Sequence, residues 1–220
     1  MAYQHQWQDG RAVGWPLGKV VCVGRNYAEH AAELNNPIPD QPLLFIKPAT
    51  AAVPLTAPLH LPMGQGETHY EAELAVLIGE PLRHASESEV RDAIAGIGLA
   101  LDLTLRDLQS ELKARGHPWE RAKAFDGACP LSVFMPLKAG DDFGKLSFSL
   151  SIDGQIRQRG HTGNMITPVL TLIAYASETF SLEPGDVVLT GTPAGVGELH
   201  SGQRLELELE GRLHVETSVD

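Results

Sequence analysis

The sequence predicts a single α+β domain in which strands outnumber helices. Short apolar runs, often alternating with polar residues and bounded by glycine or proline, recur along the chain. Only a few segments show helical spacing, and no repeat or low-complexity tract divides the sequence. The length of 220 residues suits one hydrophobic core. We therefore expect one domain over residues 1–220 that consists mainly of β-strands.

The composition argues against several classes of partner. The formal net charge is −11, whereas a surface that binds nucleic acid or anionic lipid needs a basic patch. No apolar run is long enough to span a membrane, and the first residues lack the basic and apolar regions of a signal peptide. We expect a cytoplasmic protein with no nucleic-acid or membrane partner, in which Cys22 and Cys129 are buried free thiols.

About the first 60 residues are expected to form an N-terminal arm and a lid segment. Residues 1–18 fit a short edge hairpin with Asp9-Gly10 as its turn. Residues 25–34 fit a short helix, for which Asn26 is a candidate N-cap. Apolar runs predict strands on either side of this helix, at residues 19–24 and 43–47. The proline-rich segment after the second strand is expected to be irregular.

The acidic residues of segment 66–79 point to a metal site. If this segment is a strand, alternate side chains share a face, so His69, Glu71 and Glu73 lie together opposite an apolar face. Two carboxylates roughly 7 Å apart beside apolar residues repel each other and resist loss of water. A hard divalent cation such as Mg²⁺ would balance them. The alternative is a solvated polar face on an edge strand.

A third carboxylate occupies an unusual position. Residues 97–104 read as a strand whose apolar face is formed by Ile97, Leu99, Leu101 and Leu103. Asp102 lies on the other face among small residues, where an isolated carboxylate would be costly. A metal ion held between Glu71, Glu73 and Asp102 would explain both the close pair of glutamates and the acid within an apolar strand.

The other elements follow from local signals. The capping-box residues 86–89 open a helix, which Gly96 and Gly98 are expected to convert into the following strand. On a helix over residues 105–115, Arg106 and Gln109 share a face next to Asp102, with pairing of Arg106 to a nearby acid such as Asp107 as the alternative. The remaining elements are hairpins at 145–158 and 205–215, a helix at 168–177, and a strand at 187–190 that leads into the glycine-rich loop 191–197.

Five ordered motifs resemble the fumarylacetoacetate hydrolase family. They cover residues 24–34 with 44–48, 70–79, 102–109, 123–127 and 190–197. The resemblance extends from about residue 19 to the C-terminus and is strongest to the short branch that includes acylpyruvases, oxaloacetate decarboxylases and related isomerases. It implies a roll- or sandwich-like mixed β-sheet with a few short helices, a mobile N-terminal lid helix and a homodimeric assembly.

The resemblance also implies roles for individual residues. The metal ligands would be Glu71, Glu73 and Asp102, with Mg²⁺ as the cofactor and Mn²⁺ or Ca²⁺ as substitutes. The substrate would contact Arg25, Arg106, Gln109, Lys123 and Thr192. The catalytic residues would be Lys123 and the acid–base pair His30 and Glu33. His69 would support the site or the core rather than bind the metal.

These residues favour an enzyme that acts on small 2-oxo acids. The sequence has no Gly-x-Ser-x-Gly or Ser-His-Asp arrangement, so covalent catalysis is disfavoured. The first hypothesis is metal-dependent carbon–carbon cleavage of acylpyruvates, of the fumarylpyruvate or acetylpyruvate type, or decarboxylation of oxaloacetate. In the hydrolysis, His30 oriented by Glu33 would deprotonate a water molecule. The alternatives are an isomerase or tautomerase of 2-oxo diacids and a binding protein without catalysis.

Overall fold

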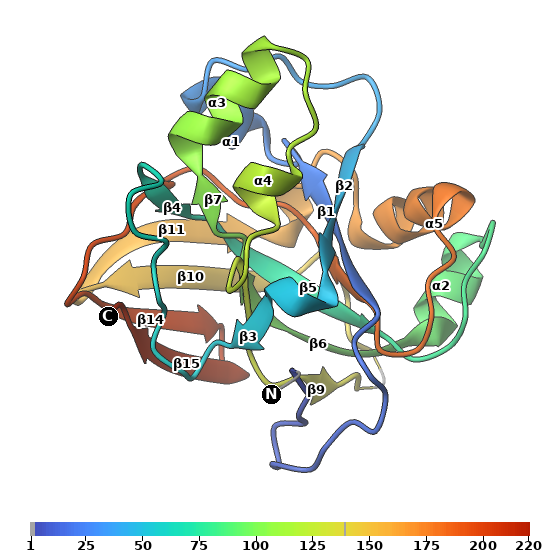
Figure 1. Ribbon diagram of the computed structural model, residues 1–220. Coiled ribbons are helices and arrows are strands. Elements are labelled where there is room, and N and C mark those ends of the chain that lie inside the picture. Colours follow the sequence, from blue (N-terminus) through green and yellow to red (C-terminus); the bar gives the residue numbers. More distant parts are fainter. Residues whose placement is uncertain (1–2, 139) are drawn as a thin grey trace.

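The computed structural model describes residues 3–138 and 140–220 and has a mixed α+β fold dominated by strands (Figure 1). Its main sheet runs in the order β2-β1-β12-β5-β6-β8-β3, and β9 pairs with β6 beside this path. The strands are β1 (Lys19–Gly24), β2 (Leu43–Pro48), β3 (Ala52–Pro54), β5 (Ala72–Ile78), β6 (Ile94–Leu101), β8 (Cys129–Leu131), β9 (Met135–Pro136) and β12 (Val187–Leu189). The β1–β12 and β3–β8 pairs are parallel and the others antiparallel, so the sheet is mixed as expected.

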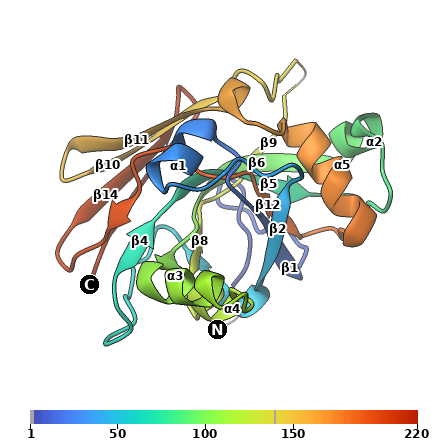
Figure 2. The same cartoon turned by 90° about the horizontal axis from the view of Figure 1, so that it is seen from above.

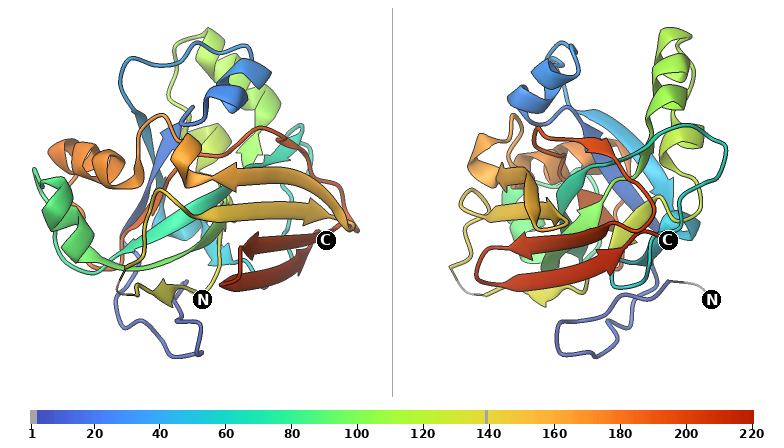
Figure 3. Two further views of the ribbon diagram at one scale, coloured as in Figure 1. Left: turned by 180° about the vertical axis from the view of Figure 1, so that it is seen from behind. Right: turned by 90° about the vertical axis from the view of Figure 1, so that its left-hand side faces the viewer.

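A second sheet packs against the main one. It is antiparallel, in the order β11-β10-β14-β15, and its gold and red strands lie together in Figure 3. Its strands are β10 (Ser147–Ile152), β11 (Gln155–His161), β14 (Arg204–Leu209) and β15 (Leu213–Ser218). A third, small sheet joins β13 (Gly197–Glu198), β4 (Thr68–Tyr70) and β7 (Thr104–Leu105). The predicted hairpins at 145–158 and 205–215 are both confirmed.

The central strands β5 and β6 are buried on both faces. Leu74 and Leu99 belong to a large apolar cluster that also contains Leu150 and Leu207 of the second sheet. Ala75 and Leu77, which point the other way, join a cluster that the N-terminal arm covers. That arm contains the predicted edge hairpin, because Gln6 pairs with Ala12 in antiparallel orientation around the turn. Burial on both sides holds these two strands, and the residues at their ends, in fixed positions.

The helices cover two ends of the sheets. They are α1 (Ala28–Glu33), α2 (Glu87–Ala93), α3 (Arg106–Ala114), α4 (Glu120–Lys123) and α5 (Val169–Thr179), with short 3₁₀ turns at Ala49–Ala51 and Thr162–Asn164. Figures 1 and 2 show α2 and α5 side by side, whereas α1, α3 and α4 lie at another end of the molecule. The predicted capping box of α2 is present. Among the described residues, no helix combines the length and apolar character needed to span a membrane.

The first helix is shorter than predicted, and Asn26 does not cap it. The helix begins at Ala28, and the N-cap position is Tyr27, whose side chain makes no capping bond. The Asn26 amide instead donates to Thr167 O at 3.0 Å and to Thr190 O at 2.9 Å. Asn26 therefore joins the segment before α1 to two distant loops. This long-range bonding overrides the local capping signal.

Two predicted strands have different limits in the structure. The strand expected over segment 66–79 is interrupted at Glu71, which lies between β4 and β5. The strand expected at residues 97–104 starts earlier, at Ile94, and ends before Asp102. Gly96 does not end the helix as predicted but lies inside β6, where a side chain does not fit since a Cβ would come within 2.6 Å of Met135 O. The glycine allows β9 to approach closely.

Candidate active site

Three carboxylates meet where β5 begins and β6 ends. Glu73 lies in β5, Glu71 just precedes that strand, and Asp102 just follows β6. The N–H of Asp102 donates to Glu71 O at 2.8 Å, which ties the two chain segments together. Each residue offers a carboxylate oxygen, and these oxygens lie within 4.8 Å of one another. All three residues are buried, so the grouping that the sequence predicted is present.

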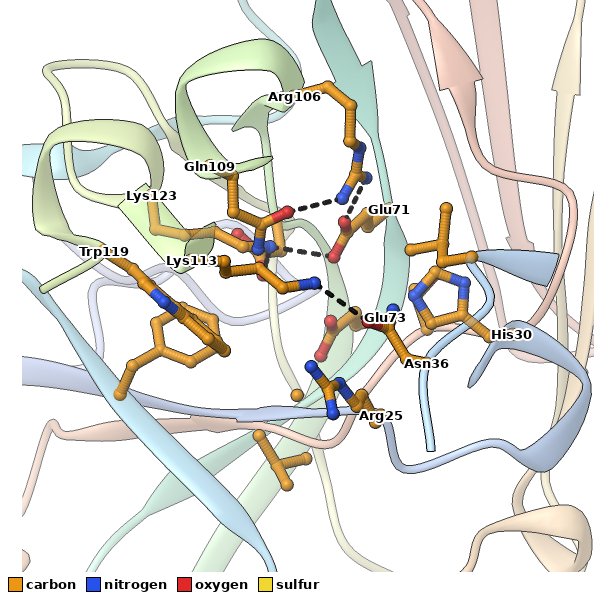
Figure 4. A pocket seen from close by; sticks show the side chains of 16 residues that line it. Arg25, His30, Asn36, Glu71, Glu73, Arg106, Gln109, Lys113, Trp119 and Lys123 are labelled. Atoms are coloured by element: carbon orange, nitrogen blue, oxygen red, sulfur yellow. Dashed lines mark hydrogen bonds and ion pairs between the residues drawn. The ribbon is translucent and has the colours of Figure 1, made fainter. Parts of the chain in front are cut away.

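Two cations neutralise part of this acidic group. The ammonium of Lys123, from α4, lies 2.9 Å from Glu71 Oε2 and 2.6 Å from Asp102 Oδ2. It also donates to Thr104 Oγ1 at 2.7 Å. Arg106 Nη2 lies 2.5 Å from Glu71 Oε1 (Figure 4). The sequence argument that these acids lack compensating charge is therefore wrong for Glu71 and Asp102.

Lys47 is a third buried cation at this site, and the sequence analysis gave it no role. Its side chain is fully buried, with Nζ 2.7 Å from Asp102 Oδ1. The ammonium donates to Ala128 O at 2.9 Å, to Leu103 O at 3.3 Å and to the carbonyl of Lys123. A lysine inside the apolar strand β2 was the available signal, because a buried lysine requires partners.

The charges around Glu73 differ from those around Glu71. Burial alone would raise the pKa of Glu71, but Lys123 and Arg106 hold that pKa well below its usual value. Burial, Asp102 and Glu71 together raise the pKa of Glu73 well above its usual value. Its carboxylate accepts a hydrogen bond from Gly191 N at 2.6 Å. The site therefore favours additional positive charge beside Glu73.

The donor set fits a hard divalent cation. Three carboxylates offer the oxygen ligands that Mg²⁺ and Mn²⁺ prefer. Asp102 Oδ1 is buried and accepts no hydrogen bond, because its close contact with Lys47 lacks hydrogen-bond geometry. Such an oxygen keeps its lone pairs available for another ligand. Glu71, Glu73 and Asp102 are thus the residues that would hold the ion.

The acidic group opens into a pocket that contains the other predicted residues. The free space inside it is about 30 Å³ in this structure, so the lining side chains nearly fill it. The predicted site residues that line it are Arg25, His30, Glu71, Glu73, Asp102, Arg106, Gln109, Lys123 and Thr192. Phe45, Trp119 and Leu34 supply apolar walls. Charged side chains beside apolar walls form the kind of lining that binds a small organic acid.

His30 faces this pocket from the short helix α1. Its Nδ1 lies 3.2 Å from Glu33 Oε2, so the predicted pair is present. The other oxygen of Glu33 accepts from Gly195 N at 3.0 Å. The second bond joins α1 to the glycine-rich loop, and His30 is buried with only 5 % of its surface exposed. The helix therefore covers the pocket in this structure.

Some side chains that are expected to bind the substrate already form bonds to other residues of the protein. Arg106 donates to Gln109 Oε1 at 2.7 Å, so the two residues share a face as predicted. Arg106 pairs with Glu71 rather than with the suggested neighbour Asp107. The hydroxyl of Thr192 donates to Ala72 O at 2.9 Å, which binds the loop to the start of β5.

His69 does not belong to the acidic group. Its Nε2 lies 2.9 Å from Glu67 Oε2, and its Nδ1 accepts from Arg106 Nε at 3.4 Å. The ring therefore contacts the guanidinium that in turn pairs with Glu71. This arrangement agrees with a supporting position rather than metal ligation.

Comparison with known proteins identifies the family. Residues 19–220 match the family described as fumarylacetoacetate (FAA) hydrolase C-terminal. The chain belongs to this family. The resemblance read from the five sequence motifs is thereby confirmed, and so is the fold class.

Relatives within the fumarylacetoacetate hydrolase family span nearly the whole chain. Oxaloacetate tautomerase YcgM of Escherichia coli is 52 % identical over 210 residues, covering 95 % of this chain and 96 % of the relative. The mitochondrial oxaloacetate decarboxylase of Dictyostelium discoideum is 41 % identical over 206 residues, covering 93 % and 91 %. The crystal structure of fumarylpyruvate hydrolase from Pseudomonas aeruginosa in complex with Mn²⁺ and pyruvate superposes with a TM-score of 0.91 at 35 % identity, covering 99 % and 95 %.

Proposed function

We propose that the protein is a divalent-metal-dependent enzyme that interconverts the keto and enol tautomers of oxaloacetate. One observation is the main support for this proposal: the carboxylates of Glu71, Glu73 and Asp102 lie in one pocket with a histidine, His30, which a fourth carboxylate orients. The relative named oxaloacetate tautomerase, 52 % identical to this chain, supports the choice of reaction. We therefore prefer tautomerisation, which the sequence suggested as an alternative, to carbon–carbon cleavage, which was the first hypothesis.

Keto–enol exchange needs a group that moves a proton between carbon and oxygen. His30 meets this need, because Glu33 contacts Nδ1 and leaves Nε2 as the ring nitrogen for the substrate. A bound Mg²⁺, or Mn²⁺ or Ca²⁺ in its place, would supply a Lewis acid that polarises the 2-oxo group. Arg106 and Lys123 add positive charge where the enolate oxygen develops. Gln109 and Thr192 would complete the contacts with the bound acid.

Hydrolysis of an acylpyruvate is the second candidate. The structural similarity to fumarylpyruvate hydrolase in complex with Mn²⁺ and pyruvate favours it. The same His30–Glu33 pair would then deprotonate a water molecule, which attacks the distal carbonyl. Decarboxylation of oxaloacetate, the activity in the name of the Dictyostelium relative, requires no such water. The three reactions therefore share a site but differ in what His30 must do.

A substrate panel distinguishes the candidates. Purified protein with Mg²⁺ is given enol-oxaloacetate, and the decay of its ultraviolet absorbance is compared with the release of pyruvate. Loss of enol without pyruvate supports tautomerisation, whereas stoichiometric pyruvate indicates decarboxylation. Acetylpyruvate and fumarylpyruvate are assayed in parallel for hydrolysis. Enol decay that equals the buffer rate, with and without Mg²⁺, refutes the proposal.

A further inference from the structure

Two cations in the pocket have no carboxylate partner among residues 3–138 and 140–220. Lys113, on the last turn of α3, donates to Asn36 Oδ1 at 2.9 Å. Arg25, just after β1, donates to Pro37 O at 3.4 Å. Both side chains are partly buried and line the same pocket as the acidic group. Figure 4 shows both, with the contact between Lys113 and Asn36 drawn.

The other cations of the pocket are already paired. Arg106 contacts Glu71, and Lys123 contacts both Glu71 and Asp102. Outside the pocket, Arg115 near Lys113 pairs with Glu111 at 3.0 Å. The pair formed by Arg25 and Lys113 is thus a local excess of positive charge inside a pocket, in a protein whose net charge is −11.

Holding two cations close together is electrostatically unfavourable, and this affects the pKa of Lys113. Burial and the neighbouring Arg25 and Arg106 lower the pKa of the Lys113 ammonium. An anion placed between Arg25 and Lys113 would remove this cost. The contact with Asn36 fixes the Lys113 ammonium, and the contact with Pro37 O orients the Arg25 guanidinium.

The two cations lie on the path expected for an extended substrate. Arg106, Gln109 and Lys113 are spaced i, i+3 and i+7 on α3, so they form a stripe along one helix face. The stripe begins next to Glu71 and ends at the basic pair. A 2-oxo acid whose oxo-carboxylate end lies at the acidic group would direct its other end along this stripe.

We infer that Lys113 and Arg25 form a subsite for the second carboxylate of a 2-oxo diacid and so select diacids over monoacids. This inference rests on the proposed function, because it takes the acidic group as the place of the oxo-carboxylate end. The guanidinium and the ammonium offer charge-assisted hydrogen bonds to that carboxylate. Hydrogen bonds to a charged group contribute enough for roughly 10- to 100-fold discrimination.

The test measures binding of two acids that differ only at the distal end. Oxaloacetate and 2-oxobutyrate share the oxo-carboxylate end, but 2-oxobutyrate carries a methyl group in place of the second carboxylate. Calorimetric titrations in Mg²⁺ compare the wild type with Lys113→Met and Arg25→Gln. We expect the preference for oxaloacetate to fall roughly 10- to 100-fold in each variant. Lys145→Met is the matched control, since Lys145 is exposed outside the pocket, and it should keep the full preference.

Kinetics add a second measurement. For enol-oxaloacetate, Lys113→Met should raise KM more than it lowers kcat, and Lys113→Arg should restore most of the loss. A preference for the diacid that is unchanged in Lys113→Met and Arg25→Gln overturns the inference. The titrations measure binding and not turnover. They therefore test the subsite even if the wild type fails to tautomerise oxaloacetate. That failure would overturn the proposed function alone.

Discussion

The Lys123 ammonium lies 2.6 Å from Asp102 Oδ2 and joins that carboxylate to Glu71, 2.9 Å away on the other side. The two acids come from neighbouring strands, so this cation links them in addition to the bond from Asp102 N to Glu71 O. The sequence suggests that Lys123 matters for the chemistry and little for folding. The structure changes that expectation, because Lys123 is only 3 % exposed and its pKa, which burial alone would lower, is raised by Asp102 and Glu71.

Replacement of Lys123 should therefore destabilise the metal-free protein. Loss of one partner from a buried ion pair typically costs about 3–5 kcal/mol, since the remaining charges stay uncompensated. In EDTA, Lys123→Met should lower the free energy of unfolding by an amount in this range. Excess Mg²⁺ should recover part of the loss, because the ion offsets the same carboxylates. Denaturant titrations with and without Mg²⁺ measure both effects. A variant as stable as wild type in EDTA would show that the pair contributes nothing.

Glu73 should be essential for metal affinity. Its carboxylate has no cation partner within the described part of the chain, and it faces two other acids. Glu73→Gln removes one anionic ligand while keeping the shape of the side chain. Changes at residues that merely support ligands cost about 10–100-fold in affinity, so loss of a ligand should cost at least that much.

Calorimetric Mn²⁺ titration of chelator-treated protein measures this affinity. Glu120→Gln serves as the control, because Glu120 is exposed on α4 and should bind Mn²⁺ like the wild type. Equal Mn²⁺ affinity in Glu73→Gln and the wild type would exclude Glu73 as a ligand. Full turnover by the wild type in excess EDTA would exclude the metal-dependent reaction itself.

The sequence predicts the acidic group but not the ion pairs that its members form with Arg106 and Lys123. Alternation places Glu71 and Glu73 on one face, and this holds even though the strand is broken between β4 and β5. A lysine inside the apolar strand β2 signals a buried cation, but no local pattern shows that the partner of Lys47 is Asp102, which follows a distant strand. Asn26 illustrates the same limit, since its local signal favours a cap whereas its bonds to Thr167 and Thr190 depend on the folded chain.

Lys47 should contribute to stability as well as to the site. Its ammonium satisfies carbonyls of three segments and contacts Asp102. Lys47→Met would leave Asp102 and the carbonyls of Leu103 and Ala128 with fewer partners in the buried interior. Each buried polar group left unsatisfied costs about 1–3 kcal/mol, so we expect a loss of several kcal/mol. Urea unfolding at constant Mg²⁺ measures it, and a loss below about 1 kcal/mol would contradict this role.

The two free cysteines should be unreactive in the folded protein. Cys22 and Cys129 are buried, and burial raises the pKa of the Cys129 thiol to about 12. Because the thiolate is the reactive form and makes up only about 10⁻⁴ of this thiol at pH 8, the reaction should be very slow. A disulfide-exchange reagent should label neither cysteine in native protein and both in denaturant. Rapid labelling of the native protein would show that the core around β1 and β8 opens readily.

The last prediction separates the reactions through the His30–Glu33 pair. Hydrolysis of an acylpyruvate needs an activated water, and tautomerisation needs a proton carrier, so both should depend on His30. Decarboxylation of oxaloacetate forms its enolate without a base. A positioned general base contributes about 10²–10⁴-fold, and His30→Ala should reduce hydrolysis and tautomerisation by a factor in this range while reducing decarboxylation much less.

Glu33→Gln tests whether turnover depends on the position of α1 over the pocket or on the negative charge beside His30. Glutamine can still accept the hydrogen bond from Gly195 that holds α1 on the glycine-rich loop. It carries no negative charge, unlike the carboxylate that lies 3.2 Å from His30 Nδ1. We therefore expect kcat for tautomerisation to fall in Glu33→Gln with little change in KM, whereas displacement of the lid would change both. Steady-state kinetics of all three reactions in both variants provide the measurement. If His30→Ala lowers every reaction equally, α1 acts in closure or binding, and His30 is not the proton carrier.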